Sequence, residues 1–221
     1  MKSILCYGDS NTWGSATDGR ASGRYGPSER WPGVLAQALG EGFHIVEEGL
    51  PGRTSVFDDP IEGAFRNGRT YLVPCLLSHR PLDLVIIMLG TNDLKVRFGL
   101  SAGEIAFGVG ALVDDIYRTK SGRGPAAEGV GPDGATPQVL MVAPAPPTTP
   151  GPGLRDMFAG ASERAEGMSA AYAAVAKDRG AHFFDAGTII QASDFDGIHL
   201  DVDMHERLGR ALAERAAAIL G

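Results

Sequence analysis

The sequence contains few cysteines, few aromatic residues and no long apolar run. Its two cysteines, Cys6 and Cys75, each lie inside a short apolar segment, so we expect two buried free thiols. No apolar run approaches the roughly 20 residues that a membrane-spanning helix needs, and no secretory leader is recognisable near Met1. These absences predict a cytoplasmic protein with no membrane partner.

Positive charge is also scarce. The chain has 20 Lys and Arg residues against 27 Asp and Glu residues, which gives a net charge of −7. Nucleic-acid binding requires clustered positive charge, so nucleic acid is excluded as a partner. The apolar fraction of 43% is that of an ordinary globular protein, and the length of 221 residues suits a single domain spanning residues 1–221.

Strand-like and helix-like segments alternate along the chain. The strand-like segments are residues 3–7, 43–47, 82–89, 138–142 and 182–184. The helix-like segments are residues 31–40, 70–79 (helical or turn-rich), 101–120 (opening on a Ser101–Glu104 capping box), 160–179 and 202–220. Such alternation predicts an α/β fold: a three-layer α/β/α sandwich with a flavodoxin-like parallel sheet.

Two segments rich in glycine and proline interrupt this alternation. Residues 121–137 are expected to form an exposed loop. Residues 144–153 directly follow a predicted strand, so we expect them at the sheet edge where α/β proteins place their sites. The strand–helix alternation continues across both segments, and neither is therefore a domain boundary.

Polar turns bracketed by glycine follow several predicted strands. The turns are residues 8–14, 49–54, 90–93 and 196–199. In a parallel sheet the carboxyl ends of the strands share one edge, so these four turns are expected to converge on one site.

The residues in these turns fit nucleophilic catalysis. Ser10 follows the first strand, but a serine hydroxyl is a weak nucleophile unless a base lies within hydrogen-bond reach. His199 is the candidate base, and Asp196, three residues earlier, is placed to orient its imidazole. Metal ligation is not part of this prediction, and no cofactor is expected.

An acyl-transfer reaction also needs donors for the oxyanion of its tetrahedral intermediate. We expect these to be the backbone N–H groups of Ser10 and Gly52 and the side-chain amide of Asn92. Each residue also has an ordinary structural alternative: a helix N-cap for Ser10 and turn formation for Gly52 and Asn92.

Three neighbours of the predicted catalytic residues are candidates for substrate contact. Asn11 and Trp13 follow Ser10, and Ile198 lies between Asp196 and His199. Core packing is the alternative for Trp13 and Ile198. Asp93 is expected to hold its turn as a hydrogen-bond acceptor, and Asp9 similarly.

The four turns resemble the four sequence blocks of the SGNH (GDSL-type) hydrolases, in their usual order. The matching residues are Gly8-Asp9-Ser10, Gly52, Gly90-Thr91-Asn92-Asp93 and Asp196-Gly197-Ile198-His199. The surrounding segments 7–14, 47–50, 82–93 and 183–187 resemble bacterial arylesterases with acyltransferase or perhydrolase activity.

This resemblance implies a serine esterase in which Ser10 is the nucleophile, Asp196 and His199 are its partners, and Gly52 and Asn92 complete the oxyanion hole. It implies a small-molecule ester substrate of short chain length, an acyl-enzyme that water, an alcohol or peroxide can resolve, and a homo-oligomer. The physiological substrate and the ratio of hydrolysis to transfer stay open.

Other functions are compatible with parts of the pattern. Within the esterases, the alternatives are a carbohydrate acetylesterase and a lysophospholipase or thioesterase. Outside them, the strand-end side chains suit a metal-dependent phosphoesterase; these are Asp9, Asn92, Asp93, Asp196 and His199. A flavodoxin-like binding module without catalysis is the last alternative.

Overall fold

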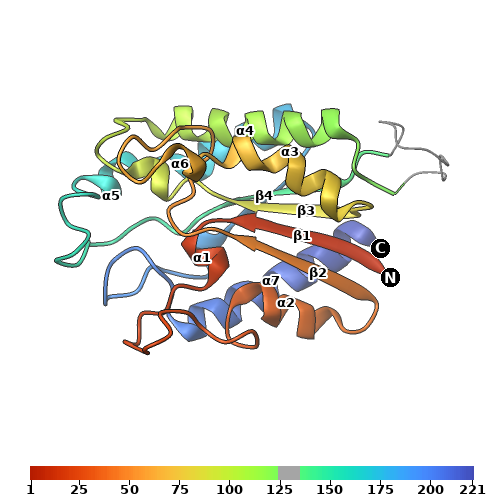
Figure 1. Cartoon of the computed structure of the whole chain (residues 1–221), viewed down its shortest axis with the longest axis horizontal. Coiled ribbons are helices and arrows are strands. Elements are labelled where there is room, and N and C mark those ends of the chain that lie inside the picture. Colours follow the sequence, from red (N-terminus) through yellow and green to blue (C-terminus); the bar gives the residue numbers. More distant parts are fainter. Residues whose placement is uncertain (124–134) are drawn as a thin grey trace.

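One parallel β-sheet organises the computed structural model, which describes residues 1–123 and 135–221 (Figure 1). Its strands are β1 (Lys2–Gly8), β2 (Phe43–Gly49), β3 (Leu84–Met88), β4 (Gln138–Ala143) and β5 (His182–Asp185), in the spatial order β2-β1-β3-β4-β5. Every neighbouring pair is parallel. The predicted α/β class is confirmed.

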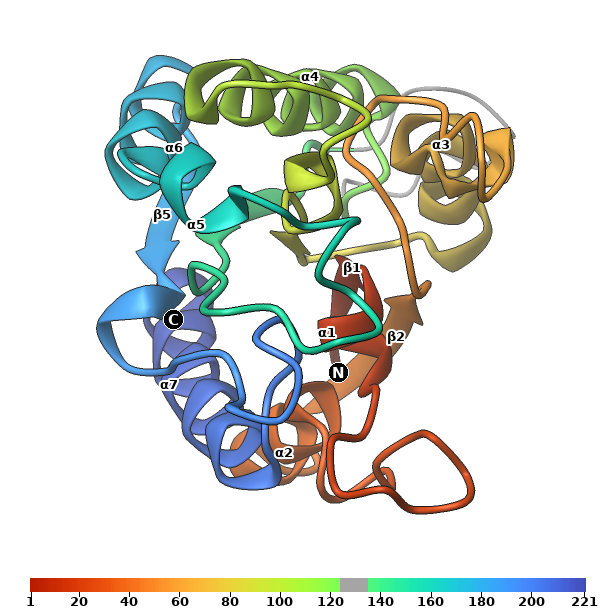
Figure 2. The same ribbon diagram turned by 90° about the vertical axis from the view of Figure 1, so that its left-hand side faces the viewer.

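Helices cover both faces of the sheet (Figure 2). The helices are α1 (Ser10–Trp13), α2 (Trp31–Leu39), α3 (Gly68–His79), α4 (Ala102–Thr119), α5 (Ala161–Arg164), α6 (Met168–Asp178) and α7 (Val202–Leu220), with short 3₁₀ turns η1 (Ala64–Arg66), η2 (Asn92–Leu94) and η3 (Ala186–Thr188). Helices α3, α4 and α6 lie on one face, and α2 and α7 pack on the other.

Alternation along the strands divides the core into two layers. In β1, Leu5 and Tyr7 pack with the α3, α4 and α6 side, whereas Ile4 and Cys6 pack with α2 and α7. Successive side chains of a strand point to opposite faces, so a strand covered on both sides is apolar at every position. Cys6 and Cys75 are both buried and unbonded, as expected.

Two loop and helix predictions differ from the structure. The predicted helix 160–179 is broken into α5 and α6, because the backbone turns left-handed at Gly167 (φ 77°) just before α6. The predicted exposed loop 121–137 begins with buried residues, since Gly122 pairs with Leu82 and Ala135. Most of that loop, residues 124–134, lies outside the described residues. The capping box of Ser101 and Glu104 is present at the start of α4.

The strand register aligns the turns that carry the predicted site. Gly8 pairs with Gly49 on one side and with Met88 on the other, so β1, β2 and β3 reach the carboxyl edge of the sheet together. Among the helices of the described residues, none has both the length and the apolar character to cross a bilayer.

Candidate active site

Ser10 lies at the first position of α1, immediately beyond the end of β1. Asp9 is the N-cap of this helix, and its Oδ1 accepts a hydrogen bond from the Asn11 backbone N–H at 2.9 Å. The cap is therefore made by Asp9 and not by Ser10. A rigid buried strand on one side and a capped turn on the other fix the Ser10 backbone, including the N–H group predicted for the oxyanion hole.

Asp196 and His199 form a hydrogen-bonded pair on the turn that precedes α7. The Nδ1 atom of His199 lies 2.6 Å from Asp196 Oδ2, and Asp196 Oδ1 accepts the backbone N–H groups of Ile198 at 2.9 Å and His199 at 2.8 Å. Burial by itself raises the pKa of Asp196, but the bonds and charge of His199 outweigh it and the net pKa lies below the usual value. An ionised Asp196 holds the proton on Nδ1, so Nε2 presents a lone pair.

Gly197 allows this turn to pack against the proline-rich loop. Its φ of 74° is left-handed, and a Cβ there would lie 2.4 Å from the Thr149 carbonyl oxygen. Backbone hydrogen bonds join Thr148 N–H to Gly197 O and Gly151 N–H to Asp196 O, each 2.9 Å long. The loop 144–153 therefore braces the Asp196–His199 turn at the predicted edge of the sheet.

The two further oxyanion donors predicted from the sequence also lie at this edge. Gly52 has a φ of 78°, a conformation that residues with a Cβ rarely adopt, and a Cβ at this position would lie 2.6 Å from Glu62 Oε2. Asn92 begins η2, shortly after the end of β3, and its side-chain Nδ2 lies 3.3 Å from Asp9 Oδ2.

A cavity of about 230 Å³ brings these groups together. Its lining residues are Ser10, Ser15, Pro51, Gly52, Glu62, Asn92, Lys95, Leu154, Met157, Phe158, Ile198 and His199. Ser10 and His199 share this cavity, although no hydrogen bond joins their side chains among the described residues. Such contacts are often long in a free enzyme and tighten when substrate binds.

Two of the three predicted substrate contacts lie elsewhere among the described residues. Ile198 lines the cavity, but Asn11 and Trp13 do not. Asn11 donates to the carbonyl of Ile198 and accepts from the N–H of Leu200, both at 3.2 Å. Its buried side chain therefore holds the backbone on both sides of His199. Trp13 instead lies under Arg24, whose guanidinium carbon is 4.7 Å from the ring centroid.

Two fully buried carboxylates lie behind the cavity. Burial raises the pKa of Asp9 to about 6, and burial likewise raises the pKa of Asp93 to about 6, with the nearby charge of Asp9 adding to it. Asp93 accepts from the backbone N–H of Ser55 at 3.0 Å and from its hydroxyl. Asp93 is thus a hydrogen-bond acceptor, as expected, but it ties η2 to the segment after Gly52 and does not only hold its own turn.

The apolar wall of the cavity was not predicted from the sequence. Leu154, Met157 and Phe158 follow the proline-rich loop, and the Met157 carbonyl accepts the Val96 N–H at 2.9 Å. These residues lie in an irregular segment without strand or helix periodicity, so no pattern in the sequence marks them as cavity residues.

An ion-pair network that borders the cavity was also not predicted from the sequence. Lys95 is buried, and its Nζ lies 2.7 Å from Glu62 Oε1. Arg97 contacts Asp59 at 2.7 Å. Burial alone would raise the pKa of Asp59, but the N–H groups of Ile61 and Glu62 and the Arg97 guanidinium lower it to about 2. The charges are spread over residues 59–97, and only folding brings them together.

The strand-end side chains do not gather as metal ligands. In the described part of the chain, the group of His, Cys, Asp or Glu side chains close enough to share one ion is Glu48, Cys75 and His79. None of the five residues that would serve a metal-dependent phosphoesterase belongs to it.

A parallel sheet with a cavity lined by Ser10 and His199 at the carboxyl edge of its strands is the arrangement expected of a serine hydrolase. The family model of the GDSL-like lipase/acylhydrolase family matches residues 6–207, and the chain belongs to that family. It is accordingly a carboxylic ester hydrolase, and the resemblance to SGNH hydrolases is confirmed.

Solved structures of esterases match the whole chain. The inhibitor-bound aryl esterase of M. smegmatis has a TM-score of 0.90 and 41% identity, with 100% of both chains covered. A carbohydrate acetylesterase from Sinorhizobium meliloti has a TM-score of 0.89 and 43% identity over 99% of this chain and 100% of its own. A carbohydrate acetylesterase family member from the same organism has a TM-score of 0.88 and 36% identity, with full coverage of both chains. No curated protein matches the chain.

Proposed function

We propose that this protein hydrolyses short-chain aryl and alkyl esters through an acyl-enzyme formed on Ser10. The observation that carries the proposal is the shared cavity of Ser10, His199, Gly52 and Asn92, with Asp196 bonded to the imidazole from behind. The similarity to an aryl esterase over the full chain supports the same substrate class.

The proposed mechanism has two half-reactions. Nε2 of His199 removes the proton from Ser10 Oγ as the oxygen attacks the ester carbonyl, and the resulting imidazolium returns the proton to the leaving alcohol. Water then attacks the acyl-enzyme, again with His199 as base. Asp196 stays ionised and stabilises the imidazolium in both halves.

The oxyanion of each tetrahedral intermediate is proposed to accept hydrogen bonds from the N–H groups of Ser10 and Gly52 and from the Asn92 amide. Donors fixed before the reaction stabilise developing charge without reorganising, and each contributes about 10²–10³ in rate. The left-handed backbone at Gly52 supports this role, because it sets the direction of that N–H.

The size of the cavity favours a short acyl group. A volume of about 230 Å³, walled by Leu154, Met157 and Phe158, is small beside typical small-molecule sites of roughly 300–1,000 Å³. A lipid chain would extend beyond it, so a lysophospholipase role is disfavoured. Acyl transfer to an alcohol or peroxide uses the same acyl-enzyme and belongs to the proposal.

A second candidate is the deacetylation of carbohydrates. It is favoured by 43% identity to a carbohydrate acetylesterase over nearly the whole chain. In both candidate functions the cavity holds the acetyl group, and the two substrates differ only in the alcohol that leaves. Rates on an acetylated oligosaccharide and on an aryl acetate, compared at equal enzyme concentration, separate them.

The proposal includes three features of the enzyme as a whole. Residues 1–221 act as one hydrolase domain, which the single sheet of the described residues supports. The enzyme acts in the cytoplasm, and it assembles into a homo-oligomer, which light scattering of the purified protein would test.

The deciding experiment is the hydrolysis of p-nitrophenyl acetate in the presence of a chelator. Ser10→Ala should lose nearly all turnover. Ser15→Ala is the matched control, because Ser15 lines the same cavity and should keep most of the rate. Equal rates for wild type and Ser10→Ala would refute Ser10 as the nucleophile. A burst of p-nitrophenol at high enzyme concentration would report the acyl-enzyme.

A further inference from the structure

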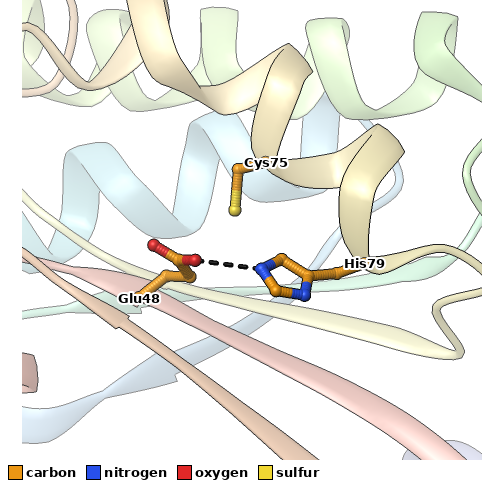
Figure 3. A group of neighbouring side chains, drawn as sticks. All are labelled: Glu48, Cys75 and His79. Atoms are coloured by element: carbon orange, nitrogen blue, oxygen red, sulfur yellow. Dashed lines mark hydrogen bonds and ion pairs between the residues drawn. The ribbon is translucent and has the colours of Figure 1, made fainter.

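Three potential metal ligands meet between α3 and β2, outside the candidate active site. Cys75 and His79 lie one turn apart on α3 and point toward Glu48 of β2 (Figure 3). Their ligand atoms all lie within 4.8 Å of one another, and His79 Nε2 is 3.0 Å from Glu48 Oε1. The spacing i, i+4 on a helix places both side chains on one face.

These distances suit a single small cation. Around a tetrahedral zinc ion with ligands at about 2.0–2.3 Å, neighbouring ligand atoms lie about 3.3–3.6 Å apart. The His79–Glu48 contact is already close to that separation, and small side-chain rotations of Cys75 and Glu48 would bring all three to it. A thiolate, an imidazole and a carboxylate together form a typical zinc ligand set.

The cluster is reachable from solvent on one side. Cys75 is fully buried, but the side chains of Glu48 and His79 are 20% and 33% exposed. None of the three lines the cavity that contains Ser10. An ion entering past His79 would find the thiol at the inner end and leave one coordination position facing solvent.

The charge balance also favours a divalent ion. Arg53 is the buried cation nearby: it donates to the Glu48 carbonyl oxygen, and its guanidinium carbon lies 4.1 Å from the Tyr7 ring centroid. Because Arg53 bonds the Glu48 backbone and not its carboxylate, that carboxylate and a Cys75 thiolate supply two negative charges, equal to the charge of a divalent ion. A metal ion that binds a thiol displaces its proton.

We propose that Glu48, Cys75 and His79 bind one zinc-like divalent cation that links α3 to β2. On binding, the Cys75 S–H bond breaks, its proton passes to solvent, and the sulfur electron pair forms the bond to the metal. The His79–Glu48 hydrogen bond is replaced by one metal bond to each partner, and water completes the coordination. The site takes no part in ester hydrolysis.

Titration of the metal-free protein with Co²⁺ tests the proposal. A cobalt–thiolate bond gives a charge-transfer absorption in the near ultraviolet, so only a cysteine can produce the signal. The sequence has two cysteines, which makes Cys6→Ala the matched control: like Cys75, Cys6 is a buried free thiol. We expect one equivalent of Co²⁺ to produce the band in wild type and in Cys6→Ala, and no band in Cys75→Ala.

Two further variants test the other two ligands without altering a buried core residue. His79→Ala and Glu48→Gln alter partly exposed side chains, and each should weaken Co²⁺ binding by roughly 10–100-fold or more. Zn²⁺ should raise the melting temperature of wild type and displace the cobalt band, with no such rise in His79→Ala. No band at excess Co²⁺, a band that persists in Cys75→Ala, or unchanged affinity in both His79→Ala and Glu48→Gln would overturn the proposal.

Discussion

Asp9 and Asn92, 83 positions apart in the sequence, meet behind the cavity, where the Asn92 side-chain Nδ2 donates to Asp9 Oδ2 at 3.3 Å. The same carboxylate caps α1 through its other oxygen. One buried group therefore positions both the turn that carries Ser10 and the amide proposed for the oxyanion hole.

Asp9→Asn should lower kcat with little change in KM. Asparagine caps a helix about as well as aspartate, so the bond to the Asn11 N–H is retained. Its amide nitrogen, however, cannot accept from Asn92, and a misaligned oxyanion donor should cost roughly 10–100-fold in kcat, compared with about 10²–10³-fold for the complete loss of the donor in Asn92→Ala. Steady-state kinetics on p-nitrophenyl acetate measure both.

The stability of Asp9→Asn serves as the control for this prediction. Burial raises the pKa of Asp9, so the ionised form is disfavoured in the folded protein and the neutral amide should not lower the free energy of unfolding at neutral pH. A variant with full kcat would show that Asp9 does not orient Asn92.

Asp196→Asn should reduce kcat by about 10⁴-fold while the protein stays folded. The asparagine oxygen can still accept the N–H groups of Ile198 and His199, so the turn is kept. Its amide faces His199 Nδ1 as a donor, which moves the imidazole proton to Nε2 and removes the base. Circular dichroism checks the fold, and a rate within tenfold of wild type would contradict the proposed role.

Gly52→Ala should lose both stability and activity, whereas Gly167→Ala should lose stability alone. The two glycines have φ values of 78° and 77°, so alanine in either should cost about 1–2 kcal/mol of unfolding free energy. A Cβ at Gly52 also meets Glu62, but at Gly167 it meets nothing within 4 Å. Urea unfolding measures the cost of backbone strain in both variants, and kcat reports displacement of the Gly52 N–H. Equal kcat values in the two variants would show that Gly52 is not part of the oxyanion hole.

His205 should make stability fall as the solution becomes acidic. This buried ring accepts the Trp31 N–H at Nδ1. Burial lowers its pKa from 6.5 to about 3; the charges of His199 and Arg30 also lower it, whereas the charge of Asp201 raises it. A depressed pKa stabilises the fold above pH 6.5, and that contribution is lost as the pH falls from 6.5 toward 3.

The comparison with His205→Asn isolates this contribution. Asparagine keeps an acceptor for Trp31 but does not titrate. Between the two pKa values, the unfolding free energy of wild type should fall by about 1.4 kcal/mol per pH unit more steeply than that of the variant. Urea titrations at several pH values measure the difference, and parallel slopes would show that His205 is not the titrating group.

Local sequence determined the sheet and the residues at its edge. The apolar runs of β1 and β3 have no polar face, which requires burial on both sides, and the glycine-bracketed turns must follow where those runs end. The Asp196–His199 spacing is local as well, since three residues on one turn suffice to join the carboxylate to the imidazole.

Tertiary structure decided what surrounds those residues. Asn11 was predicted to contact substrate, but its side chain stabilises the turn that carries His199. The sequence could not show this, because its hydrogen-bond partners lie 187 and 189 positions away. The apolar wall at Leu154, Met157 and Phe158 and the Glu62–Lys95 pair depend on contacts between distant irregular segments, which carry no periodic signal. The sequence alone thus specified the predicted catalytic groups, whereas the cavity proposed to hold the substrate depends on long-range packing.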